Sequence, residues 1–416
     1  MKNALAPVAA LLIGVSILLA GSGLQGTLLP VRASLEAFST LAIGTMGAAY
    51  FLGFTLGCLK GGQLVKNVGH VRVFLAMTAL GSAAPLLHGL ILNPLAWGVL
   101  RFLTGFCFAV LFVVIESWLN ERSTNEDRGV VFSTYVMITL TVMAAGQMMT
   151  LLYDPSGLEL FIIASVLVSL GAVPVALSRS QTPEIPTETD VNLPRLFKIS
   201  PSAVFGCLAT GLANGAFWAF APVFTAGLSD DTSLAAWFMT ATVFGGALAQ
   251  WPLGFLSDRI GRRKALSIAA GCGSVVSAAI VSLSGELGFW GINLLGAAWG
   301  FFAFPLYSLA VAHANDYAEP SDYVMVSSGL LFVFGSGAIL GPFAASAIMT
   351  MTSSAGLYIL SGVAHLSVAL YVLFRIFRRT SAPTDQHITF SDALATAHTA
   401  SQVYEEEIHY QADDET

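Results

Sequence analysis

The sequence predicts an all-α integral membrane protein with about twelve transmembrane helices. Three observations predict this fold: very few charged residues, apolar runs as long as a membrane span, and basic residues on alternate connectors. Of the 416 residues, 55% are hydrophobic and only 10% are charged, whereas a soluble domain carries about 25% charged residues. So few charges cannot cover a water-exposed surface of this size, so we expect the chain to lie in a lipid bilayer.

The apolar residues come in blocks that match the ~20 residues a helix needs to cross the hydrocarbon core. The blocks are continuous and do not alternate over about ten residues, which favours helices over the strands of a barrel. The first block resembles a signal peptide, but it is too long for one and is interpreted as the first span. The expected spans are 5–29, 39–59, 71–92, 95–118, 129–152, 158–178, 201–227, 233–253, 265–284, 288–312, 323–349 and 355–375.

The longest connector between these spans, 179–200, divides them into two groups of six. We therefore expect an N-terminal half (1–178), a cytoplasmic connector (179–200), a C-terminal half (201–377) and an acidic cytoplasmic tail (378–416). After Arg379 the tail holds eight acidic residues and no Lys or Arg, so much of the net charge of −7 belongs to it. The sequence has no basic patch of the kind that predicts nucleic-acid binding.

The basic residues indicate the orientation of the chain in the membrane. If the N-terminus is cytoplasmic, 16 of the 18 Lys and Arg residues fall in cytoplasmic segments, Arg32 lies outside and Arg101 lies within the membrane. Positive charge is enriched on the cytoplasmic side of membrane proteins. We therefore expect both termini in the cytoplasm and the protein in the cell (inner) membrane.

The two halves share a motif after their second helices. Residues 62–69 (GQLVKNVG) and 254–261 (GFLSDRIG) have the same frame, G-x-L-x-x-x-x-G. Repeated halves are typical of secondary transporters, whose substrate site lies between the halves at mid-membrane. Residues 254–263 resemble the signature loop of the major facilitator superfamily, G-x-L-x-D-R-x-G-R-R, and the N-terminal copy departs from it at Lys66 and His70.

Further segments carry the same resemblance over about residues 1–380. Residues 101–105 (RFLTG) are similar to the family's R-x-x-x-G motif in the fourth helix, whereas the fifth helix lacks the G-P pair of drug/proton antiporters. Residues 69–72 (GHVR) and 116–119 (ESWL) resemble the YcaD-like branch, which implies no known substrate. The resemblance implies the major facilitator fold, with two pseudo-symmetric six-helix halves and transport by alternating access.

The resemblance also implies a gate at the loop between the eighth and ninth helices. Asp258 is expected to cap the N-terminus of the fifth helix while the cytoplasmic side is closed, because a helix N-terminus carries partial positive charge. Arg262 is expected to hold Asp258 and to reach Asp316. The alternative is a basic loop that serves only the charge bias. The expected gating residues are Gly254, Asp258, Arg259, Gly261, Arg262, Arg263, Gly62, Gly69, Asp316 and Glu116.

Two charged residues of the fourth helix lie in or near the membrane. Arg101 is deep within the span, where an Arg costs about 2.5–3.5 kcal/mol, so it needs a partner. Glu116 is too far away to serve, because 15 residues of helix span about 22 Å. The partner is left open between Gln25 of the first helix, backbone carbonyls, water and an anionic group on the substrate. For Glu116 we expect pairing with Lys66, Arg72 or Arg128, and the alternative is a proton-carrying role.

Polar and aromatic residues of several spans are expected to line the cavity of such a transporter. The expected substrate-binding residues are Arg101, Gln25, Gln147, Asn214, Trp218, Asn293, Trp299 and Tyr307. They indicate a nearly neutral, aromatic site that suits an amphipathic or apolar molecule. Each residue alone is a weak indicator, because polar residues also join helices in membranes.

The sequence contains no pattern that predicts an enzyme, a cofactor or a metal site. The four cysteines form no C-x-x-C pair. We expect a secondary active transporter of a small organic molecule, acting as a monomer in the lipid bilayer. Substrate, direction and coupling ion, a proton or another, are left open. The alternative is a non-transporting membrane sensor or scaffold that acts through the acidic tail.

Overall fold

The computed structural model describes residues 8–123, 128–177, 192–229, 231–319 and 322–378. In this part of the chain the regular structure is entirely helical, which confirms the predicted fold class. The acidic tail and most of the connector, with the functions considered for them, lie outside the described residues.

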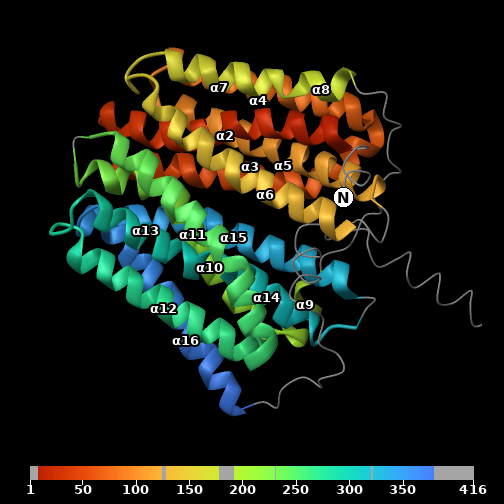
Figure 1. Ribbon diagram of the computed structural model, residues 1–416, viewed down its shortest axis with the longest axis vertical. Helices are drawn as coiled ribbons and strands as arrows, with labels where there is room; N and C mark the ends of the chain where they lie inside the picture. The colour runs from red at the N-terminus through yellow and green to blue at the C-terminus, as the bar shows by residue number, and fades with distance from the viewer. Residues whose placement is uncertain (1–7, 124–127, 178–191, 230, 320–321, 379–416) are drawn as a thin grey trace, which may run out of the picture.

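The two halves of the sequence form two groups of helices that lie side by side, one above the other in Figure 1. The N-terminal group consists of α2 (Ala9–Leu35), α3 (Thr40–Val68), α4 (His70–Leu90), α5 (Pro94–Glu121), α6 (Arg128–Met148), η2 (Met149–Leu151), α7 (Glu159–Leu170) and α8 (Ala172–Leu177). The C-terminal group consists of α10 (Pro201–Ala226), α11 (Ser233–Ile260), α12 (Arg262–Leu283), α13 (Phe289–Ala303), α14 (Pro305–Asn315), α15 (Tyr323–Met351) and α16 (Gly356–Arg378), preceded by the short helix α9 (Leu193–Ile199).

By length and composition, eleven helices or helix pairs of the described part could cross a membrane. The pairs α7–α8 and α13–α14 each form one crossing. α11 has 28 residues, enough for a twelfth, but its segment TATVFGGALAQW is less apolar. Thr240 of this segment faces the other half of the protein, as described below.

Three helices end more than three residues beyond the expected spans. α2 ends at Leu35 and not at residue 29, α3 ends at Val68 and not at 59, and α11 ends at Ile260 and not at 253. Hydropathy marks the hydrocarbon core, whereas the helical hydrogen bonds continue through the polar interface until a residue ends them.

The two glycine motifs are therefore mostly helical, which corrects the expectation that they form loops between the spans. Gly62 and Gly254 lie inside α3 and α11. Only Gly69 and Gly261 turn the chain, with φ angles of 95° and 92°. A residue with a Cβ rarely adopts this conformation, so one glycine in each half makes the sharp turn into the next helix.

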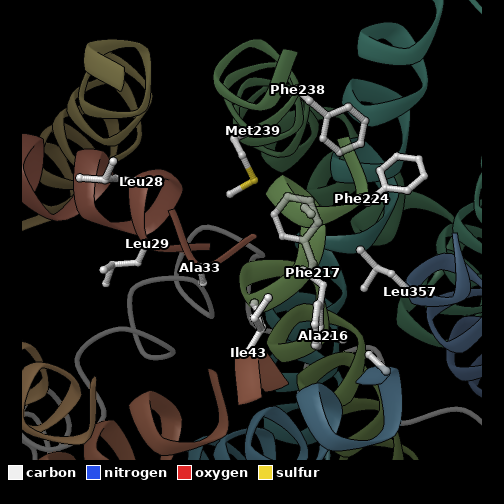
Figure 2. Packing of buried hydrophobic residues seen from close by; sticks show 14 of the residues in the cluster. Leu28, Leu29, Ala33, Ile43, Ala216, Phe217, Phe224, Phe238, Met239 and Leu357 are labelled. Atoms are coloured by element: carbon white, nitrogen blue, oxygen red, sulfur yellow. The ribbon is translucent and has the colours of Figure 1, made fainter. Parts of the chain in front are cut away.

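The two ends of the bundle differ in how the halves are joined. The connector end is the end that holds α9, Gly69 and Gly261, and the opposite end holds the turn between α2 and α3. At the opposite end a single hydrophobic cluster includes residues of both halves, such as Leu28, Ile43 and Phe217, as Figure 2 shows. Toward the connector end, the clusters contain residues of one half only. The halves are thus packed together at one end of the molecule.

Within the N-terminal half, α3 and α5 cross at glycine residues. A Cβ at Gly105 would collide with the carbonyl oxygen of Tyr50, and a Cβ at Gly53 with that of Phe102. Small residues allow membrane helices to approach to backbone contact. The C-terminal half repeats this arrangement between α11 and α13, where Gly245 and Gly300 lie against the carbonyl oxygens of Ala297 and Thr242.

The variant Gly105→Ala should unfold at a lower temperature than the wild type. The added methyl group forces α3 away from α5, and overpacking of this kind costs about 1–3 kcal/mol. Gly98→Ala on the same helix is the matched control, since nothing lies within 4 Å of its added Cβ. Thermal unfolding of the detergent-purified variants measures the difference, and equal stability of the two would contradict the close crossing.

Candidate functional site

A cavity of about 800 Å³ lies between the two halves. Its walls come from α2, α3, α5 and α6 on one side and from α10, α11, α14 and α15 on the other. It extends to Gln63 and Glu116 near the connector end. Its size is in the range of small-molecule sites, about 300–1,000 Å³.

Direct contacts between the halves close the cavity at the opposite end. A Cβ at Gly44 of α3 would lie 2.9 Å from the carbonyl oxygen of Pro342 on α15. The Thr240 hydroxyl of α11 donates a hydrogen bond to the carbonyl oxygen of Ala144 on α6 (3.3 Å). Together with the shared hydrophobic cluster, these contacts mean that the cavity opens toward the connector end.

Arg101 and Glu116 are the only charged residues among the described residues that line the cavity. The guanidinium carbon of Arg101 lies 4.1 Å from the centre of the Tyr50 ring. No described residue forms an ion pair with Arg101 or accepts a hydrogen bond from it, so of the partners left open by the sequence, Gln25 and the backbone carbonyls of the described residues are not used here. Its N–H donors therefore remain available to a ligand.

Several other polar side chains on the cavity wall are buried without a hydrogen-bond partner among the described residues. They include Gln25 on α2, with a free Nε2, Asn214 on α10, with a free Oδ1, Gln250 on α11, with a free Oε1, and Tyr307 on α14, with a free hydroxyl. Buried polar groups normally have partners. Unpaired polar atoms around a cavity are what a polar ligand can bind.

An aromatic wall, defined here as Trp218 of α10 and Phe304 between α13 and α14, forms part of the C-terminal side of the cavity. The two rings are stacked with their centres 6.0 Å apart and their planes 5° from parallel. Tyr307, three residues after Phe304 in the sequence, packs on Phe334 of α15 with the ring centres 5.0 Å apart. These rings offer apolar faces to a bound molecule.

Two of the expected substrate-binding residues do not lie in the cavity. Trp299 is fully buried and donates its Nε1–H to Ser277 (3.1 Å) and Ser361 (2.9 Å). It occupies the face of α13 that packs on α12 and α16. Asn293 donates to the carbonyl oxygen of Phe289 (2.7 Å) near the start of α13, beyond the closed end of the cavity. The sequence shows that Trp299 and Asn293 lie on the same helix, but it does not show which neighbouring helix packs on each face of that helix.

Gln147 lines the cavity at its closed end. It is 1% exposed, and the Thr240 hydroxyl approaches its Oε1 at 3.5 Å across the two halves. Gln147 therefore belongs to the contact that closes the cavity as much as to its wall.

Arg262 begins α12 directly after the Gly261 turn and is surrounded by acceptors. Its Nη1 lies 2.5 Å from Oδ1 of Asp258 and donates to the Ser257 hydroxyl at 3.0 Å. Its Nε lies 3.6 Å from Oδ2 of Asp316, at the end of α14. The side chain of Arg262 is 3% exposed and that of Asp258 is 40% exposed. In this conformation Asp258 pairs with Arg262 of its own motif. The hydrogen bond between α11 and α6 lies at the closed end of the cavity, from Thr240 to Ala144.

Glu116 forms no ion pair with Lys66 or Arg72 in the structure. The side chain of Arg128, its third expected partner, lies outside the described residues. Glu116 instead lines the cavity near its mouth, beside Ser117 and Asn120.

Sequence reasoning missed Tyr50, Phe304 and Cys58 as cavity residues. A signal for Tyr50 exists in the sequence: Gly53 and Gly57 recur at helical spacing and mark the face of α3 that approaches α5. Tyr50 lies one turn before Gly53 on that face. Cys58 is half-buried in the cavity wall, and nothing in the sequence separates it from the other cysteines.

Comparison with known proteins agrees with this architecture. Residues 11–224 and 203–402 match the model of the Major Facilitator Superfamily. The chain belongs to this superfamily. It therefore has the fold of twelve transmembrane helices and is a multi-pass membrane protein, and the family supports a role in membrane transport.

Curated relatives place the chain near one branch of the superfamily. It is 26% identical over 380 residues to the protein described as an uncharacterized MFS-type transporter YcaD of Escherichia fergusonii, covering 91% of this chain and 97% of that protein. The YcaD protein of Shigella flexneri is equally similar. The predicted resemblance to the YcaD-like branch is thus confirmed.

Two solved structures share the fold at low sequence identity. The nucleoside transporter NupG superposes with a TM-score of 0.78 at 13% identity, covering 90% of this chain and all of that one. A bacterial homologue of the human lysosomal transporter Spinster, in an inward-facing and unoccupied conformation, gives a TM-score of 0.65 at 12% identity, covering 96% and 99%. At these identities the likeness shows the fold alone.

Arg262→Gln should destabilise the protein more than Asp258→Asn. Arg262→Gln removes the ion pair with Asp258 and also the one with Asp316, in which both side chains are 3% exposed, and breaking a buried ion pair costs about 3–5 kcal/mol. Asp258→Asn removes only the 40% exposed carboxylate and leaves Arg262 paired with Asp316, so its cost should be nearer the ~1 kcal/mol of a partly exposed pair. Thermal or denaturant unfolding of the two variants gives the comparison. An equal or reversed order would show that Arg262 does not hold this part of the C-terminal half together.

Proposed function

We propose that this protein is a secondary active transporter that moves a small organic molecule across the cell (inner) membrane by alternating access. The observation that carries the proposal is the cavity between the halves, closed at one end by a shared hydrophobic cluster and open at the other. Two halves with separate cores and a common contact at one end are able to rock about a central site.

The orientation follows from the basic residues. The connector end carries Lys60, Lys66, Arg72 and the basic residues after Gly261, so it faces the cytoplasm by the charge bias. The structure then corresponds to the inward-facing state. Both termini are cytoplasmic, and the turn between α2 and α3 faces outward.

The substrate contacts proposed for this state come from both halves. Arg101 and Gln25 belong to the N-terminal half, and Asn214, Trp218 and Tyr307 to the C-terminal half. A molecule bound between them contacts both walls, so its binding energy depends on how far apart the halves stand. This dependence is what couples binding to the change of conformation.

The gate proposed for the opposite state uses Asp258. When the cytoplasmic ends of the halves close, its carboxylate reaches the N-terminus of α6 and caps the free N–H groups there. The partial exposure of Asp258 supports this role, because a carboxylate available to a second partner need not leave a buried site. Arg262 keeps it oriented in both states.

Alternating access predicts that Cys58 reacts with a membrane-impermeant maleimide from either side of the membrane. A double variant, Gly44→Cys with Ser346→Cys, places two thiols at the outward end, where a Cβ at Gly44 would lie 3.0 Å from the Cβ of Ser346. After oxidation, labelling of Cys58 from outside should stop and labelling from the cytoplasm should continue.

The controls for this experiment are the single variant Gly44→Cys and reduction of the disulfide, which should restore labelling from outside. Cys272→Ala is introduced throughout, since Cys272 is the other half-buried cysteine, while Cys107 and Cys207 are buried. Mass spectrometry locates the label. A sensor or scaffold with one conformation exposes Cys58 to one side only, whether or not the thiols are oxidised, and that result would refute the transporter.

Reporter fusions test the orientation independently. A fusion after Arg379 and a second one within residues 179–200 should both report a cytoplasmic location, because the positive-inside rule places both segments there. A fusion in the turn at residues 36–39 serves as the outward-facing control. An outward signal from either of the first two would exclude the proposed arrangement.

A further inference from the structure

We propose that the cavity selects an organic monoanion, a carboxylate or a sulfonate, whose charged group binds Arg101 and whose apolar body lies against the aromatic wall. This inference rests on the proposed function, because it names the class of molecule that the cavity carries. It is carried by the geometry around Arg101, which lies over an aromatic ring and forms no ion pair with a described acid.

The contact with Tyr50 leaves the guanidinium group free to bind an anion. A cation over an aromatic ring presents its flat face to the ring. The N–H donors of a guanidinium point outward in its own plane, in a fork that matches the two oxygens of a carboxylate. Tyr50 supports the guanidinium carbon through its ring face at 4.1 Å, and no described residue accepts a hydrogen bond from Arg101 or forms an ion pair with it.

The glycine crossing of α3 and α5 holds the two side chains in this arrangement. Gly105 lies one helical turn after Arg101, and its Cα face touches the backbone of Tyr50. Any larger residue at position 105 would move α3, and the Tyr50 ring with it. The R-x-x-x-G pattern of this helix therefore combines the charge with the small residue that lets its aromatic support approach.

The charge of Arg101 has no compensation within the cavity. Glu116, the other charged residue of the lining, lies 15 residues further along α5, about 22 Å away. While the cavity is open, water solvates the guanidinium. When the halves close around a substrate, that water leaves, and an unpaired charge in a low-dielectric site is costly. A bound anion pairs with Arg101 and so offsets the cost of its buried charge. A neutral molecule leaves this charge unpaired, and a cation would repel it.

A second donor and the apolar wall define the rest of the site. Gln25 is 2% exposed, lines the cavity from α2 and has an unpartnered Nε2. It can donate a further hydrogen bond to the anion or to a polar atom beside it. The stacked rings of Trp218 and Phe304 face the same cavity from the C-terminal half. One cationic side chain favours a single negative charge over a multiply charged phosphate ester.

The test uses matched pairs of compounds on the purified full-length protein. Aromatic and aliphatic carboxylates and sulfonates, such as benzoate and hexanoate, are each compared with the uncharged primary amide or sulfonamide of the same shape. Thermal unfolding over a range of concentrations gives an apparent Kd, because a ligand that binds only the folded state raises the unfolding temperature. The comparison on the wild type requires no variant.

Three variants then assign the effect to Arg101. Arg101→Gln should weaken binding of the acids roughly ten- to hundredfold, the effect of losing a charge-assisted hydrogen bond, and should leave binding of the amides unchanged. Arg101→Lys should retain part of the binding, since it keeps the charge but not the fork. Arg378→Gln is the matched control, an arginine that also lies over a ring, Phe374, but at the connector end of α16 outside the cavity.

Each outcome decides the proposal. Tighter binding of acids than of their amides by the wild type, lost in Arg101→Gln and kept in Arg378→Gln, supports it. Amides that bind as well as acids, no binding by any acid in the set, or unchanged acid binding by Arg101→Gln would overturn it. The labelling of Cys58 is measured without any substrate, so alternating access can hold while the anion proposal fails.

Discussion

The architecture depends on a hydrophobic cluster that joins the two halves at one end only. Residues such as Leu28, Ile43 and Phe217 come from different halves and lie in one cluster, whereas the clusters nearer the connector belong to one half each. In a membrane the faces exposed to lipid contribute little to holding two halves together, so close packing and polar contacts decide where they meet. The halves touch from that end as far as Thr55 of α3 and Gly335 of α15, and the cavity lies between them toward the connector end.

The same close packing places the chemistry of the site. Arg101 is tolerated deep in α5 because its guanidinium lies over the Tyr50 ring and lines the cavity, which a polar ligand or solvent can enter. Both conditions require α3 to touch α5 at Gly105 and Gly53. A methyl group at position 105 would push α3 away from α5, and the Tyr50 ring would move away from the guanidinium of Arg101. The backbone contact and the charged site are therefore two consequences of one sequence pattern.

The sequence predicted the parts of this structure that depend on composition and local pattern. Apolar runs of the right length give the helices, and the glycine motif gives the family. The helix ends were misplaced, as at Val68 and Ile260, because hydropathy stops at the lipid boundary and hydrogen bonding does not. Trp299 was misassigned to the cavity and Tyr50 was missed, since a single sequence shows which residues share a face but not which helix covers it. Contacts between distant helices, such as Thr240 with Ala144, lie beyond what spacing along one chain contains.

The two copies of the glycine motif differ in a way that bears on the gate. Gly69 and Gly261 make the same turn, with nearly equal φ angles. After Gly261, the buried Arg262 ties Asp258 and Asp316 together by charge. After Gly69 stands His70, whose Nε2 lies 3.1 Å from the hydroxyl of Ser117, a residue of the cavity wall on α5.

The N-terminal turn is thus held by the hydrogen bond between His70 and Ser117 and not by an ion pair. The position that holds Asp258 in the C-terminal motif holds Lys66 in the N-terminal one. A carboxylate that can cap a helix N-terminus on the other half exists only in the C-terminal copy. If closure at the connector end uses such a cap, it is supplied from one side, by Asp258 to α6. The fold repeats almost symmetrically, but the charges that can act between the halves do not. In the proposed transport cycle, the gating carboxylate Asp258 and the cavity cation Arg101 therefore belong to different halves, and both would act when the halves approach at the connector end.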